Sequence, residues 1–231
     1  FFDSANISIF RHFPHITISL QNVIVSDYLA IQSQKIPLQL ENLEVGLSLK
    51  DWRNKTFEVQ FFKLSDGKIL IHKDSLGYNN LSSLFPDKEG GNEELMLPKH
   101  GIQIKSDNIR FELNNVGIRI INECKGTSIL GQIHSLQSKL KMEDKEIFAA
   151  NVMDIDMEEL GFNKAKGVFL KNSRLKGTFE ANYKEGILSV NPFDLGIKDQ
   201  HFLFSAEFNV SQTAPSKLVL ENHHTDYDKF L

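Results

Sequence analysis

The chain has a single cysteine and no excess of basic charge, and each of these features excludes a class of site or partner. Cys124 is the single cysteine among 231 residues, so the sequence offers no internal disulfide and no zinc site built from cysteines. The formal net charge is -4 and the lysines are scattered among acidic residues, which leaves no basic footprint for nucleic acid. We therefore expect no nucleic-acid partner, while the cysteine count fits a reducing cytosol and a periplasm equally well.

Long apolar runs are missing as well. No stretch reaches the roughly 20 apolar residues that a membrane-spanning helix needs, and no basic-then-apolar leader opens the sequence. The sequence begins with Phe1-Phe2-Asp3 and not with Met, so we expect a targeting or anchoring segment to precede it in a longer protein.

Clusters of catalytic type are scarce. Asp154, Asp156 and Glu158 alternate with apolar residues and share one strand face, where calcium binding or acid-base chemistry would be feasible. No glycine-bearing metal loop accompanies them, so a solvated outer face is the favoured interpretation. A secreted hydrolase domain would need clustered acids or a nucleophile with its base, and neither is visible. We expect a protein that is not an enzyme and holds no cofactor.

The histidines give no better site. His223 and His224 are adjacent, and adjacent residues of an extended strand point to opposite faces, so with Asp226 and Asp228 they are interpreted as a frayed terminus and not as metal ligands. The pair 11–12, Arg then His, could meet lipid headgroups, although an exposed basic pair beside aromatic residues needs no such role.

Many segments of the sequence alternate apolar and polar residues. Ile16, Ile18 and Leu20 alternate with polar residues, and the runs 43–49 and 57–61 do the same. Further strand-like runs cover 102–104, 109–113, 116–121, 136–142, 147–157, 168–170, 175–183, 187–190, 202–210 and 218–220. We predict a mainly β fold of half-buried antiparallel strands, with short helices only near 27–34 and 81–85.

Turn residues separate these runs. Asp66-Gly67 lies between the runs 61–64 and 68–71 and predicts a hairpin, because both residues tolerate positive φ. Turn-type residues at 106–108, 114–115, 143–145 and 184–186 separate later runs. The segment 86–94, rich in proline, glycine and acids, predicts a flexible loop. We expect a β unit over 1–86, a loop over 87–97, and a continuing sheet over 98–231 that is either separate or part of one domain with the first unit.

An ordered set of short motifs runs from residue 7 to residue 85. Phe13-Pro14 precedes a strand that ends in Asn22-Val23-Ile24-Val25, and the Asp66-Gly67 step, Gly77-Tyr78-Asn79-Asn80 and Leu81-Ser82-Ser83-Leu84 follow in that order. In order and spacing these motifs resemble the amino-terminal unit of the AsmA-like family of bacterial envelope proteins. The segment 166–177 is similar to middle regions of such proteins from the Bacteroidetes group.

This resemblance implies a fold, a location and a role. Its fold would be a long, strongly curved antiparallel meander sheet with an apolar inner groove, in a periplasmic body that an amino-terminal helix anchors to the inner membrane. Its role would lie in outer-membrane biogenesis or phospholipid traffic, with phospholipid acyl chains, the membrane and other envelope proteins as partners.

Candidate groove residues follow from the alternating strands. Phe202, Phe204, Ala206, Phe208 and Val210 share one strand face, in a chain with 18 phenylalanines. The full set of candidates for contact with lipid is Ile16, Ile18, Leu20, Val45, Leu47, Leu49, Phe57, Val59, Phe61, Phe202, Phe204 and Phe208. The alternative for the same residues is an ordinary closed β core, in a structural or assembly scaffold for outer-membrane components that docks partner proteins.

Overall fold

The computed structural model describes residues 1–13, 15–26, 31–48, 56–81, 103–105, 107–143, 146–163, 167–198, 200–209 and 216–222. The fold is mainly β, as the sequence predicted, and within the described residues the helical ones are Ile31 and Gln32. Residues 27–30 of the helix predicted over 27–34, residues 82–85 of the one predicted over 81–85, and the predicted loop over 87–97 lie outside the described residues, while Ser33 and Gln34 form a turn.

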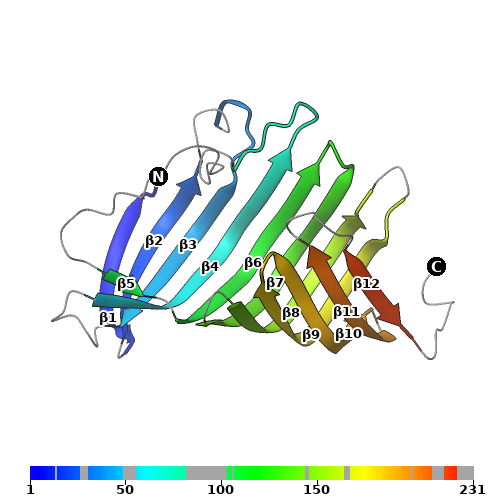
Figure 1. Ribbon diagram of the computed structural model, residues 1–231. Coiled ribbons are helices and arrows are strands. Elements are labelled where there is room, and N and C mark those ends of the chain that lie inside the picture. The colour runs from blue at the N-terminus through cyan, green and yellow to red at the C-terminus, as the bar shows by residue number, and fades with distance from the viewer. Residues whose placement is uncertain are drawn as a thin grey trace.

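Twelve strands form one sheet (Figure 1). They are β1 (Ser4–His12), β2 (His15–Val25), β3 (Leu38–Ser48), β4 (Thr56–Lys73), β5 (Gln103–Lys105), β6 (Asn108–Asn122), β7 (Thr127–Glu143), β8 (Glu146–Gly161), β9 (Leu170–Lys184), β10 (Ile187–Ile197), β11 (Gln200–Asn209) and β12 (Lys217–Glu221). Each strand pairs with the next along the chain, except that β5 and β6 both lie beside β4. β1 and β12 end this path, so the described sheet is open and not closed into a barrel.

The prediction of a purely antiparallel sheet is wrong at one place. β4 pairs with β5 and with β6 in parallel, and the β4–β6 register runs from Phe61 opposite Arg110 to Lys73 opposite Asn122. Parallel neighbours need a long crossover, because the chain must return to the end at which the first strand began. The segment between β4 and β6 supplies it. β4 and β6 therefore join the parts of the chain before and after residues 87–97 into one sheet.

The hairpin predicted at Asp66-Gly67 does not form. β4 continues through both residues, and β6 likewise continues through Asn114 and Asn115, although their turn-type side chains predicted a break between two strands there. Asp66 and Asn115 do adopt positive φ, at 55° and 54°. Residues that tolerate positive φ are typical of turns. In these two strands they form an irregularity inside the strand instead, because neighbouring strands pair with the residues before and after each irregularity.

These irregularities lie side by side across five strands, and we call their line the polar seam. Its members are Asn22, Glu41, Asp66, Asn115 and His134, each skipped by the regular pairing of its strand. In each strand the seam puts two polar residues in succession and shifts the apolar positions from even to odd numbers or the reverse. Both halves of each strand therefore keep their apolar side chains on one face, which we call the apolar face; the opposite one is the outer face.

Two clusters of buried residues lie on the apolar face. The central cluster consists of Val23, Leu40, Leu64, Leu113, Val116 and Ile133. The carboxyl-terminal cluster consists of Met157, Leu175, Phe193, Leu195, Ile197 and Phe202. The pairing register links the two, because Ile133 of the central cluster pairs with Ile155, and Ile155 pairs with Leu175.

Candidate functional site: an apolar pocket on strands β7 to β12

A pocket with a volume of about 360 Å³ lies against the carboxyl-terminal cluster. Strands β7 to β12 and the β8–β9 connection contribute side chains to it. All of the lining residues are apolar: Ile129, Met153, Leu160, Phe162, Phe169, Leu170, Leu175, Phe179, Val190, Phe193, Leu195, Ile197, Phe204, Phe208, Leu218 and Leu220. Such a lining offers ligand atoms dispersion contacts and removal from water, and no polar side chain with which to bond.

Three phenylalanine rings form one wall of the pocket. Phe193 on β10 stacks on Phe179 of β9, with ring centroids 5.0 Å apart, and makes an edge-to-face contact with Phe204 of β11, with ring centroids 5.5 Å apart. The pairing of Phe193 with Phe204 brings the last two rings together. Offset and edge-to-face contacts of this kind are the preferred arrangements of aromatic pairs.

Gly177 on β9 makes room for the Phe193 ring. A Cβ atom on Gly177 would lie 2.6 Å from Cε2 and 3.1 Å from Cδ2 of Phe193, which is closer than van der Waals contact permits. Gly177 pairs with Met153, a lining residue, so the glycine lies on the apolar face beneath the pocket. The ring of Phe193 thus packs directly against the backbone of Gly177.

Phe162 and Phe169 flank the pocket at the β8–β9 connection. Their ring centroids are 6.2 Å apart, and their exposed fractions are 46% and 50%. Two large apolar side chains that line a pocket and remain half exposed mark a side on which the pocket meets solvent.

The residues predicted to line a groove lie at two different ends of the sheet. Phe204 and Phe208 line the pocket, while Phe202 is buried in the carboxyl-terminal cluster beside it. Ile16, Ile18, Leu20, Val45, Leu47, Phe57 and Val59 lie on β2, β3 and β4, at the other end of the sheet. Leu49 is outside the described residues.

Phe61 lies apart from its predicted partners, on the outer face. Its ring covers Gly46, where a Cβ atom would lie 2.0 Å from Phe61 Cε1, and the bulge between Gly46 and Leu47 breaks the alternation that the sequence suggested. His12 meets the Phe61 ring at 5.0 Å, and the Arg110 guanidinium lies 5.8 Å from its centroid. Phe61 is therefore part of a small outer-face cluster and not of the apolar face.

Most of the pocket was missed in the sequence. Phe179 and Phe193 were not singled out, and neither were the aliphatic residues of β8 to β10. The run 175–183 shows the alternation of apolar and polar residues that could have indicated its part of the lining. In the run 187–197 the alternation is interrupted at Asn191-Pro192, where the apolar positions change from even to odd numbers, as they do at the polar seam.

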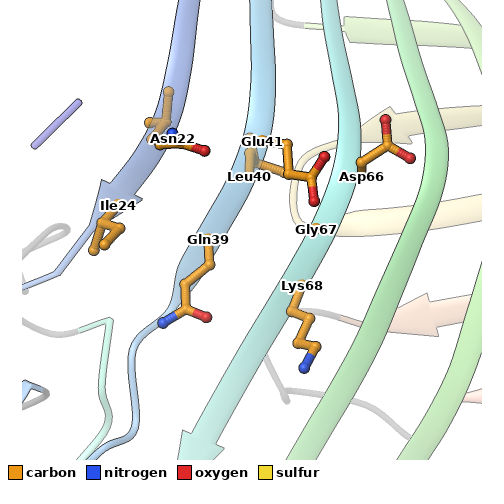
Figure 2. Close-up of a pocket in the computed structure, with 9 residues that line it drawn as sticks. Asn22, Ile24, Gln39, Leu40, Glu41, Asp66, Gly67 and Lys68 are labelled. Carbon is orange, nitrogen blue, oxygen red and sulfur yellow. The ribbon is translucent and has the colours of Figure 1, made fainter. Parts of the chain in front are cut away.

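The polar seam forms a hollow of its own, with a volume of about 330 Å³. Figure 2 shows its lining side chains from three adjacent strands: Asn22 and Ile24 on β2, Gln39, Leu40 and Glu41 on β3, and Asp66 and Lys68 on β4. Along the seam Asn22 Nδ2 donates to Asp3 Oδ2 at 2.8 Å, and Asn115 Nδ2 donates to Asp66 Oδ1 at 2.7 Å. The first bond ties β2 to the residue that precedes β1, and the second joins β4 to β6 where their regular pairing lapses.

Of the three carboxylates considered as a catalytic or calcium site, Asp154 and Asp156 lie on the outer face in ion pairs, and Glu158 is exposed. Arg174 donates to Asp154 from Nε at 2.8 Å and from Nη2 at 2.9 Å, and His134 Nε2 lies 2.7 Å from Asp156 Oδ2. The hydrogen bond from Arg174 lowers the pKa of Asp154 below its ordinary value, against the opposing effect of burial. Within the described residues, no group of three or more His, Cys, Asp or Glu side chains is arranged to hold a metal ion.

Comparison with known proteins gives no assignment: no family model matches the chain, and no curated protein matches it. In the part of the chain that the structure describes, no helix has the length and apolar character to cross a membrane.

Proposed function

We propose that this protein is a lipid-binding protein without enzymatic activity, which holds phospholipid acyl chains against the apolar face of its sheet. The pocket on strands β7 to β12 carries the proposal, because its lining residues are all apolar and its volume of about 360 Å³ lies within the range of small-molecule sites, about 300–1,000 Å³. An acyl chain gains about 0.8 kcal/mol for each methylene that it removes from water, and it needs no polar partner.

The pairing register supports a path that extends beyond the pocket. Leucines pair in succession across five strands, and the last of them pairs with a pocket residue. The row is Leu20, Leu43, Leu64, Leu113, Leu136 and Met153. A row of this kind on a curved sheet would give the apolar groove that the family resemblance implies, with the pocket at its carboxyl-terminal end.

The setting of this activity rests on the resemblance of residues 7–85 to the AsmA-like family. On that basis we propose that the chain works in the periplasm as part of a protein anchored to the inner membrane. It would bind or conduct phospholipid between the inner and outer membranes during outer-membrane biogenesis. Phospholipid, the membrane and other envelope proteins are then its partners.

The central cluster favours a second function for that part of the sheet. Val116 has an exposed fraction of 0% and Leu40 one of 3%, values typical of a closed core. A scaffold whose apolar face is filled by its own side chains would need no lipid and would act by docking other envelope proteins.

One pair of variants separates the two functions. Phe204 is partly exposed and lines a pocket that meets solvent beside Phe162 and Phe169, so the carboxylate of Phe204→Asp stays within reach of water and folding should survive. Uptake of a phospholipid with a fluorescent acyl chain should fall about tenfold or more, which corresponds to about 1.4 kcal/mol or more. Leu203→Asp is the matched control, because Leu203 is the preceding residue of β11, is 47% exposed and pairs with Asp194 on the outer face. It should bind lipid as the parent does.

Circular dichroism and thermal melting of both variants complete the test. Unfolding of Phe204→Asp alone would favour the closed scaffold. A folded Phe204→Asp protein that takes up lipid as well as the parent would exclude the pocket as the binding site.

A further inference from the structure

We propose that the pocket receives the methyl end of a single acyl chain, and that Gly177 sets the length of chain it accepts by seating the Phe193 ring. This inference rests on the proposed function and adds to it a ligand geometry and a residue that determines specificity.

The lining decides which part of a lipid can be inside. A phosphate or carboxylate buried among apolar side chains would lose its hydration without gaining a bond, at a cost far above what the remaining contacts supply. The head group therefore stays outside the pocket. A volume of about 360 Å³ is also small for a lipid with two chains, so one chain enters with its methyl end first.

Gly177 is required by the Phe193 ring and not by its own backbone. The glycines with positive φ in the described chain are Gly77, Gly126, Gly167 and Gly186, and Gly177 is not among them. An alanine Cβ at residue 177 would stand 2.6 Å from the ring of Phe193, so the ring would have to move.

The direction of that movement is limited. Phe179 stacks on Phe193 at 5.0 Å and Phe204 meets it at 5.5 Å, and all three rings line the pocket. If the Phe193 ring is pushed away from β9, it moves into the part of the pocket that the acyl chain would occupy. Gly177→Ala should therefore shorten the pocket without placing a new side chain in it.

Gly196→Ala is the matched control. Gly196 lies on the neighbouring strand β10, and a Cβ there would meet Lys176 O at 3.5 Å and Lys176 Cβ at 3.9 Å, which are ordinary contact distances. The two variants add the same methyl group to adjacent strands, and only the methyl at residue 177 meets an aromatic ring.

The experiment measures competition by saturated fatty acids of graded length, from octanoate to stearate, against a fluorescent fatty acid bound to the purified chain. For Gly177→Ala we expect unchanged affinity for the short acids and, for the long ones, a loss of about fourfold for each methylene left in water. Gly196→Ala should reproduce the parent profile. A parallel series of lysophosphatidylcholines should show the same dependence on length, because the head group lies outside the pocket.

Phe193→Leu provides a second variant of opposite sign. Removal of the ring deepens the pocket, so the preference should shift toward longer chains, and this holds whether or not Gly177→Ala folds. A parent that binds no member of either series would overturn the proposed function together with this inference. A parent that binds lipid, with length profiles unaltered in Gly177→Ala and Phe193→Leu, would overturn the inference alone.

Discussion

The central cluster and the carboxyl-terminal cluster occupy the same face of one sheet, and they differ in what they enclose. The buried members of the central cluster are all aliphatic, and Val116 among them has no exposed surface. The carboxyl-terminal cluster includes Phe193 and Phe202 and borders a pocket of about 360 Å³. The branched aliphatic side chains of the central cluster fill their space, whereas the three rings of the carboxyl-terminal region stack and meet edge to face beside a space that they do not fill. Alternation thus fixes which side chains share a face, and their shapes decide whether that face is filled.

The strongest test of this contrast places a charge in the central cluster. Val116→Asp buries a carboxylate without a partner, at a cost of several kcal/mol against a total stability of about 5–15 kcal/mol. We expect the variant to fail to fold, as seen by circular dichroism and by its insolubility. Arg119→Asp, at an exposed position of the same strand, should remain folded. A soluble Val116→Asp protein with a cooperative melt would show that the central cluster is open too.

Truncation sharpens the comparison. Leu113→Ala, at a residue that is 4% exposed, should cost about 2–5 kcal/mol, since it leaves a cavity among packed side chains. Phe208→Ala should cost about 1 kcal/mol, because the ring is only partly buried and already borders a space. Urea unfolding midpoints would measure both, and equal losses would mean that the pocket region is as tightly packed as the centre.

The polar seam can be tested at Asn115. This residue has φ 54°, a conformation that a β-branched side chain adopts at a cost of about 1–2 kcal/mol and that glycine adopts freely. Asn115→Val and Asn115→Gly both remove the hydrogen bonds with Asp66 and Gln132, so the difference between their thermal midpoints compares the backbone strain of valine with the larger unfolded-state entropy of glycine. We expect the valine variant to be the less stable. The reverse order would mean that residue 115 does not hold the left-handed conformation.

The smallest effect concerns the ion pair that joins β8 to β9 on the outer face. Arg174 lowers the pKa of Asp154 in the folded protein, so this pair stabilises the fold above the ordinary value of 3.8 and loses that contribution as the pH falls through the lowered pKa. In Arg174→Gln the loss of stability below pH 3.8 should be shallower, and the difference should be small because the pair is partly exposed and screened by water. Unfolding curves at graded acid pH, at low and high salt, would measure it. If the stability of parent and variant falls with pH in the same way, the ion pair between Arg174 and Asp154 does not contribute to the stability of the fold.

Local sequence predicted the strands better than their ends. The turn at Lys184-Glu185-Gly186 forms as predicted, with Glu185 and Gly186 both at positive φ between β9 and β10. The turn predicted at Asp66-Gly67 used the same kind of residues and was wrong. Positive φ suits both a hairpin and a bulge, so the choice depends on what pairs with the flanking residues, and Leu40 of β3 and Val116 of β6 pair with Gly67 on its two sides.

The sequence by itself determined that this protein is a sheet with one apolar face, because a strand's side chains alternate between faces and its residues alternate in polarity. It also supplied the residues that continue this face past an irregularity, in pairs such as Ser65-Asp66 and Asn114-Asn115. Only the tertiary structure decided that β4 and β6 lie parallel, and that Phe179, Phe193 and Phe204 meet above Gly177. The pairing register brings together residues that are far apart in the chain. Whether a glycine leaves a gap or makes room for an aromatic ring therefore depends on which residue the register places beside it.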